Sequence, residues 1–189
     1  IGKLSEKAKE FKTALLQNPA IENITVSNNN LISWTNSGPL DWDGRDKDEL
    51  IKIGYNWVDY DFLKTFDLEM KQGRFFSEAF PTDTGKIVLN ETAVNLLEIN
   101  DPIGKIVYLW NERTRPLEVI GVVGNVRYED LKDAGRNVVY VSQSQTYWRA
   151  MAIVVRFDGD PAGRDNDVRE AIWSVDASAP ITEVRPMSQ

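Results

Sequence analysis

The two ends of the chain contain the same succession of helix, proline and strand, and this repeat constrains the fold more than any other feature. Near the amino end, residues 4–18 place apolar side chains on one face of a helix. These apolar residues are Leu4, Ala8, Phe11 and Leu15. The segment NPAIENITV (18–26) then ends the helix at its proline and predicts a strand over 21–27.

The second copy occupies the carboxyl end. A helix is predicted from Asp160-Pro161 onward, and the segment SAPITEV (178–184) follows it with a predicted strand at 181–184. The apolar face of this helix consists of Val168, Ala171, Ile172 and Val175. A strong strand over 151–157 precedes this copy, and we expect the matching strand of the first copy just before Ile1. Two such βαβ units in one sheet predict a layer formed by both termini.

The middle of the chain is richer in predicted strands. Alternating apolar residues predict a half-buried strand over 51–57, and the run 119–123 is apolar on both faces, as in a covered central strand. The other expected elements are helices over 61–66 and 91–99, with Ala93, Leu96 and Leu97 facing inward, and strands over 86–90, 105–110 and 117–128. Residues 28–48 are expected to form a long polar loop.

These elements predict an α+β fold with two parts. Residues 1–71 and 136–189 would form an α/β subdomain of βαβ units, and 72–135 a small β-rich subdomain inserted into it.

Composition excludes several classes of function. The chain has neither cysteine nor histidine, so thiolate and histidine-dependent nucleophilic catalysis and Cys/His zinc sites are impossible. A net charge of −7 without clustered lysine and arginine argues against nucleic-acid binding. No apolar run approaches the roughly 18 residues that suggest a membrane-spanning helix.

Two local patterns could suggest ligand sites. The acidic run 41–49 lacks the glycine and glutamate spacing of an EF-hand, so we expect a solvated polar loop there. Gly121 and Gly124 lie inside a strand pattern, where glycine indicates a bulge or close packing, not a nucleotide site. The residues therefore predict no catalytic residue, no metal ligand and no cofactor.

Aromatic residues in connecting segments are the candidates for a binding surface. Trp34 and Trp42 lie in the predicted loop 28–48, and Tyr147 and Trp148 lie between predicted elements. We predict partner contacts at these four positions. An alternative for Trp34 and Trp42 is that they fold back as a lid on the strand 51–57.

Several segments, in order, resemble the MacB-like periplasmic core domain of ABC transporter permeases of the MacB/FtsX type. They are VDYDFLKTFDLEMKQGRFFS (58–77), IVLNETAVNLL (87–97), DPIGKIV (101–107), VIGVVGNVRYEDL (119–131) and DASAPITEV (176–184). The resemblance covers essentially the whole chain. It implies a porter-like layer and an inserted sabre-like subdomain, located between the first membrane helix and helices 2–4 of a permease.

The resemblance also implies a function. Such a domain is periplasmic, belongs to an inner-membrane protein, and is non-catalytic; it transmits ATP-driven movement from membrane helices to periplasmic partners or substrate. Its implied partners are its own membrane helices, a cytoplasmic ABC ATPase domain or subunit, a periplasmic adaptor or lipoprotein, and a second copy in a full-length homodimer. The alternatives are a stand-alone periplasmic module that binds a ligand or peptide, and an enzyme that uses carboxylates alone.

Overall fold

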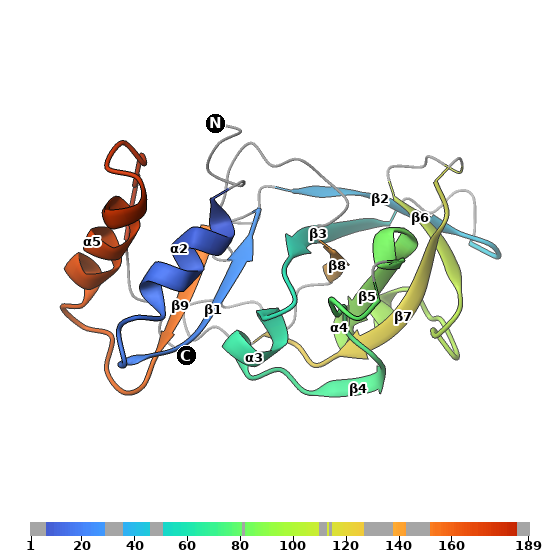
Figure 1. Ribbon diagram of the computed structural model, residues 1–189. Helices are drawn as coiled ribbons and strands as arrows, with labels where there is room; N and C mark the ends of the chain where they lie inside the picture. Colours follow the sequence, from blue (N-terminus) through green and yellow to red (C-terminus); the bar gives the residue numbers. More distant parts are fainter. Residues whose placement is uncertain are drawn as a thin grey trace.

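Strands from all parts of the chain join one mixed sheet, which helices cover at one end (Figure 1). The computed structural model describes residues 7–28, 36–45, 51–80, 82–109, 113, 115–126, 138–142 and 152–184. The elements in chain order are α2 (Ala8–Leu15), β1 (Ile21–Ser27), β2 (Ser37–Trp42), β3 (Lys52–Val58), α3 (Phe62–Phe66), β4 (Met70–Gly73), η1 (Asp83–Gly85), β5 (Lys86–Asn90), α4 (Glu91–Leu96), β6 (Ile106–Leu109), β7 (Leu117–Val123), β8 (Val138–Ser142), β9 (Ala152–Phe157) and α5 (Asp165–Val175). None of the helices in these ranges is long and apolar enough to cross a membrane.

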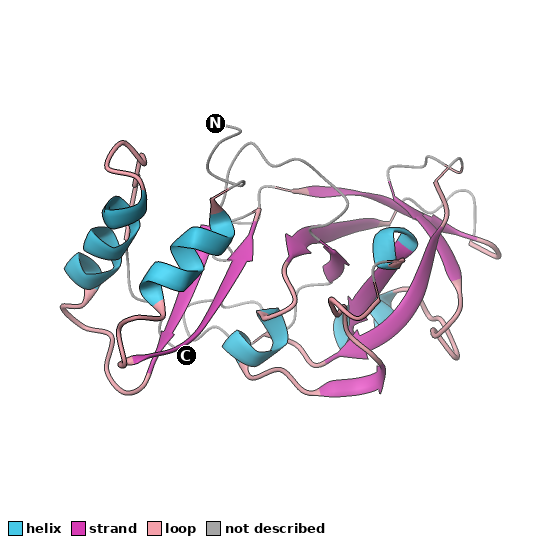
Figure 2. Ribbon diagram, viewed as in Figure 1, coloured by secondary structure: helices cyan, strands magenta, loops and turns pink. Residues whose placement is uncertain are grey.

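Elements from the two ends of the chain pack together. Strands β1 and β9 pair antiparallel along their whole length, and α2 and α5 lie side by side against them (Figures 1 and 2). They share a hydrophobic core, whose buried residues are Phe11, Leu15, Ile21, Ile24, Val168, Ile172 and Ala179. We call α2, β1, β9 and α5 the terminal layer.

The remaining strands, except β4, form a closed arrangement. Pairings run in the order β2, β6, β7, β5, β8, β3, and β3 also pairs with β2, so that these strands form a ring. A second apolar core connects them and is extended by Ala93, in α4, and by Leu97, at the C-cap of that helix. Its buried strand and loop residues are Leu40, Ile51, Ile53, Ile87, Leu89, Val107, Leu109, Val119, Val139 and Val141. We call this set of strands the strand ring.

A third apolar cluster surrounds the short helix α3, between the terminal layer and the strand ring (Figure 1). Phe62 is fully buried there, and its ring centroid lies 5.0 Å from that of Tyr140 in β8. The α3 helix ends where Asp67 adopts a positive φ of 52°. It follows β3 closely and also contacts β1 and β9.

The prediction of a covered central strand at 119–123 is confirmed. Strand β7 pairs with β4, β5 and β6, and its Val119 and Val123 are fully buried. Opposite β5, Ile120 is an extra residue that produces a bulge immediately before Gly121. A Cβ on Gly121 would lie 2.2 Å from the carbonyl oxygen of Arg74, so the predicted close packing at this glycine is also confirmed.

Other expectations need correction. The predicted loop 28–48 contains β2, whose Leu40 amide donates to the carbonyl of Ile51 at 3.1 Å. The helix expected over 91–99 ends at Leu96, because Glu98 adopts a positive φ of 49° that ends helical geometry. Leu96, expected to face inward, is 42% exposed.

Two strand predictions were wrong, the first in its extent and the second altogether. Strand β7 ends at Val123 because the Gly124 amide turns to the carbonyl of Glu69, at 2.9 Å. Residues 181–184 form no strand; Ile181 still packs on the core of the terminal layer. A strand needs a hydrogen-bonded neighbour, and the part of the chain that the structure describes provides none for this segment.

Strand pairing continues across both boundaries expected for an inserted subdomain. Strand β8, from the later segment 136–189, pairs with β5 inside 72–135 and with β3 inside 1–71. The division at 71/72 and 135/136 stays a prediction.

Candidate functional site

The aromatic residues predicted to contact partners are only partly placed. Trp42 ends β2, is half-buried, and packs against the core of the strand ring. Trp34, Tyr147 and Trp148 lie outside the described residues. Their role as partner contacts stays a prediction, and Trp42 uses part of its surface for packing within the domain.

The acidic run that begins at Asp41 is neutralised by arginines. Asp41 is bound by Arg45 at 3.0 Å and by Arg113 at 2.8 Å, and Asp43 is bound by Arg113 at 2.9 Å. The hydrogen bond from Arg113 is the main cause that lowers the pKa of Asp41. No group of three or more acidic side chains is placed to hold a metal ion within the described ranges, and positions 46–49 of the run lie outside them.

Asn90 organises the junction of β5, α4 and β8. Its side-chain oxygen accepts from the Ala93 amide at 3.0 Å, as an N-cap, and from the Val138 amide at 2.8 Å. Its side-chain amide donates to Asn125 at 2.7 Å, and Asn125 also accepts from Thr92. Asn90 is 2% exposed, so this network fixes elements inside the strand ring and presents no group to a ligand.

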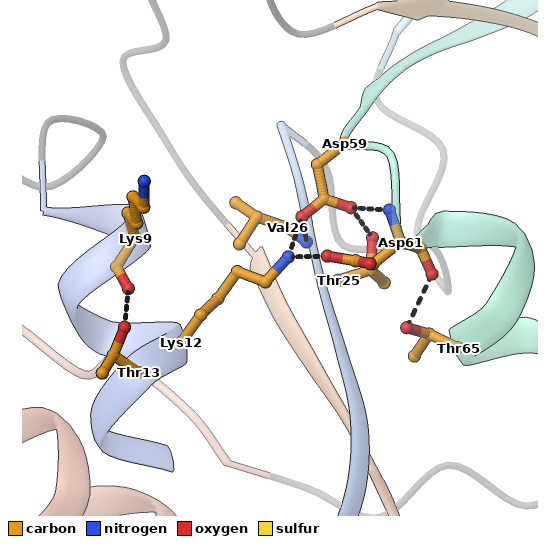
Figure 3. Close-up of polar contacts among 8 residues, drawn as sticks. All are labelled: Lys9, Lys12, Thr13, Thr25, Val26, Asp59, Asp61 and Thr65. Carbon is orange, nitrogen blue, oxygen red and sulfur yellow. Dashed lines mark hydrogen bonds and ion pairs between the residues drawn. The ribbon is translucent and has the colours of Figure 1, made fainter. Parts of the chain in front are cut away.

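A different polar network connects the terminal layer to the strand ring. Its members are Lys12 in α2, Thr25 and Val26 in β1, and Asp59 and Asp61 between β3 and α3 (Figure 3). We call these residues the Asp59 junction. They come from three separate stretches of the chain, so a movement of α2 relative to β3 would have to break contacts there.

Asp59 is the centre of this junction. Its carboxylate accepts hydrogen bonds from the Thr25 hydroxyl, from the Val26 amide at 3.0 Å and from the Asp61 amide at 3.2 Å. The Asp59 amide in turn donates to the carbonyl of Val26 at 3.2 Å. Because the Asp59 side chain is only 3% exposed, these donors replace the water that a carboxylate requires.

Lys12 supplies the cation. Figure 3 shows its side chain extending from α2 to the two carboxylates, with Nζ 2.8 Å from Asp59 and in contact with Asp61. Partial burial alone would lower the pKa of Lys12, but the hydrogen bonds to Asp59 and Asp61 outweigh burial and raise it. Lys12 therefore stays charged at any physiological pH.

The chemistry of the junction is structural. Each charge has a partner from the chain itself, and a permanently protonated lysine cannot act as a general base. What the arrangement does is hold α2 against β1, β3 and α3. Nothing in the sequence pattern singled out Asp59 or Lys12. The available signal was a lysine beside the apolar face of the first helix and a DYD segment directly after a strand.

The comparisons with known proteins agree with this architecture. The family model of the MacB-like periplasmic core domain matches residues 4–180. No curated protein is similar enough in sequence to count as a match.

Solved structures with the same fold come from several bacteria. The periplasmic region of MacB from Actinobacillus actinomycetemcomitans superimposes with a TM-score of 0.61 at 20% identity, covering 88% of this chain and 73% of that one. The extracellular domain of the noncanonic ABC-type transporter YknZ from Gram-positive bacteria superimposes with a TM-score of 0.56 at 18% identity, covering 85% of this chain and 76% of that one. A domain of a putative permease protein from Porphyromonas gingivalis superimposes with a TM-score of 0.58 at 14% identity, covering 85% of this chain and 67% of that one.

The fold is thus the mixed α+β fold of periplasmic domains of ABC-type permeases. The chain belongs to the MacB-like periplasmic core domain family, whose members are extracytoplasmic domains of inner-membrane permeases.

Proposed function

We propose that this domain transmits ATP-driven conformational change from the membrane helices of its permease to periplasmic partners or substrate during export, without catalysing a reaction. Membership of the MacB-like family supports this proposal. In the proposed assembly, the domain acts with its own membrane helices, a cytoplasmic ABC ATPase domain or subunit, and a periplasmic adaptor or lipoprotein. The full-length permease would be a homodimer.

The observation that supports the proposal most is the Asp59 junction. The two helices of the terminal layer are joined by polar contacts, since Lys7 binds Asp176 at 3.0 Å and Asn18 donates to Asp167 at 3.4 Å. The Asp59 junction then connects this layer to β3 through buried charge-assisted hydrogen bonds. A displacement that enters at the terminal layer would therefore reach the strand ring.

The same geometry supports a proposal for the surface that contacts partners. If displacement enters at the terminal layer, the strand ring is the part that acts on a partner, and Trp42 lies in that ring. We propose Trp42, together with Trp34, Tyr147 and Trp148, as partner contacts. We also propose that the β-rich segment 72–135 is the part that projects toward partners.

Spin labelling of the reconstituted full-length permease tests the proposal without knowledge of the substrate. The domain has no cysteine, so Asn95→Cys, at an exposed position of α4, gives one label per domain. We expect the distance between the labels of two protomers to change between the nucleotide-free and the vanadate-trapped states. An unchanged distance during active ATP hydrolysis would contradict transmission, and the absence of any interprotomer signal would contradict the homodimer.

A further inference from the structure

The terminal layer and the strand ring have separate apolar cores. Every buried residue in the core of the layer belongs to segments 11–24 or 168–179, and every one in the core of the ring lies between positions 40 and 141. Two bodies that each bury their own core can keep their internal packing while they change position relative to each other.

Among the described residues, the backbone connection between these bodies is short. Strands β1 and β3 are in register at one residue pair, Ser27 and Val58, whereas β1 and β9 pair over their whole length. Two backbone hydrogen bonds flank the Ser27–Val58 pair: the Asn28 amide donates to Trp57 at 3.1 Å, and the Asp59 amide donates to Val26 at 3.2 Å. A rotation about so short a ladder breaks few hydrogen bonds, which is the property of a hinge.

The other described contacts between the bodies surround α3. Val154 of β9 packs on the cluster around α3, and Arg156 donates to the carbonyl of Thr65 at 3.4 Å. A further contact comes from Lys12 of α2, whose Nζ reaches both Asp59, which follows Val58 directly, and Asp61. The Lys12 side chain is 20% exposed, so water can replace either carboxylate when α2 moves away.

We propose that the terminal layer rotates relative to the strand ring about the Ser27–Val58 pair, and that the contact of Lys12 with Asp59 and Asp61 holds the closed position. Thr25 and Val26 directly precede Ser27 in β1, so their bonds to Asp59 lie beside the axis and remain intact. Lys12 contacts the same Asp59 oxygen as the Val26 amide, but it reaches that oxygen from α2, which moves with the layer. Loss of the lysine contact therefore frees the rotation without unfolding either body. The physiological use of this hinge rests on the proposed function, but its existence is tested on the domain alone, so the two can fail separately.

Two pairs of spin labels in the cysteine-free domain separate hinge motion from general loosening. The pair Ser174→Cys and Asn95→Cys spans layer and ring, and the pair Gln17→Cys and Ser174→Cys lies within the layer; all three positions are exposed. We expect Lys12→Met to shift and broaden the distance distribution of the spanning pair and to leave the within-layer pair unchanged. Lys9→Met, an exposed lysine in the same helix, should change neither.

A spanning distance that is identical in Lys12→Met and Lys9→Met would overturn the hinge, and so would equal broadening of both pairs. If circular dichroism shows that Lys12→Met is not folded, the variant Asp61→Ala takes its place. This variant removes one of the two carboxylates that bind Lys12, and the Asp61 side chain is half-exposed. We then expect a smaller broadening of the spanning pair alone. An unchanged distribution in Asp61→Ala would also overturn the proposal.

Discussion

Replacing Asp59 with alanine should have a much larger effect on stability than replacing Asp61, although both carboxylates bind Lys12. Asp59→Ala removes the acceptor of the Val26 amide and of the Thr25 hydroxyl. Thr25 is fully buried and Val26 is 1% exposed, so neither donor gains water in exchange. Each buried donor left unpaired costs about 1–3 kcal/mol, and we expect a total loss of about 3–5 kcal/mol in the free energy of unfolding.

The control is Asp61→Ala. The Asp61 side chain is 53% exposed, and an exposed ion pair contributes at most about 1 kcal/mol. For a domain of this size, 1 kcal/mol corresponds to a shift in melting temperature of about 2–4 °C. With a loss of about 3–5 kcal/mol, Asp59→Ala should therefore melt about 6–20 °C below the unmodified domain, and Asp61→Ala within about 4 °C of it.

Urea unfolding followed by tryptophan fluorescence and circular dichroism, with melting by calorimetry, provides the measurement. The two probes should agree if unfolding is cooperative, which makes the free energies comparable. Equal destabilisation by the two substitutions would refute the reasoning, because it would mean that the buried donors on Asp59 contribute nothing beyond the lysine contact.

Three further outcomes follow from other contacts. In urea unfolding, Gly121→Ala should lower the free energy of unfolding by about 2 kcal/mol or more, because the new Cβ would meet a backbone oxygen at 2.2 Å. Gly124→Ala, whose new Cβ would have its nearest atom at 3.7 Å, should leave the free energy of unfolding nearly unchanged. Asn90→Ala should lower the free energy of unfolding by about 2–4 kcal/mol in the same assay, since it removes an N-cap and the acceptor of a second buried amide. A loss of less than about 1 kcal/mol would contradict this reasoning. The pKa of Asp176 is lowered to about 2, mainly by the Ser178 hydroxyl and by Lys7, below its ordinary value of 3.8. Its contribution to stability should therefore be complete above about pH 4 and disappear as pH falls through 2, so the melting temperatures of the unmodified domain and Asp176→Asn should converge over that range; a constant difference would argue against the shift.

Local signals predicted the elements whose boundaries are set locally. Strand β1 has the predicted bounds 21–27. The helix before it has already ended at Leu15, Pro19 disfavours helical geometry at Asn18, and the Asn18 side chain caps the turn by accepting from the Ala20 amide at 3.0 Å. Strand β5 likewise has the predicted bounds 86–90. Its last residue is the N-cap of α4, so the strand ends where the helix begins.

The elements that were missed depend on distant partners. Strand β2 contains Pro39 and Gly38, which disfavour strands in isolation, and it forms because β3 and β6 both have free edges for it. Strand β8 went unpredicted although its residues are buried, and it is held between β3 and β5.

The candidate site was harder to predict than the fold. Asp59 is one of 29 acidic residues, and its lysine partner lies 47 positions away, so no spacing rule connects them. The aromatic residues were predicted as partner contacts because tryptophan in a polar segment suggests a binding surface. Trp42 instead packs partly against the strand ring, through contacts that only the folded chain creates.

The most direct test of transmission combines both label positions in the full-length permease with its ATPase. Labels at Ser174→Cys report on the terminal layer, and labels at Asn95→Cys report on the strand ring. With Lys12→Met, we expect the change in interprotomer distance between nucleotide-free and vanadate-trapped states to persist at Ser174→Cys and to diminish at Asn95→Cys, while Lys9→Met leaves both changes intact. A full nucleotide-dependent change at Asn95→Cys in the Lys12→Met permease would show that movement reaches the ring without this contact, and would contradict the account.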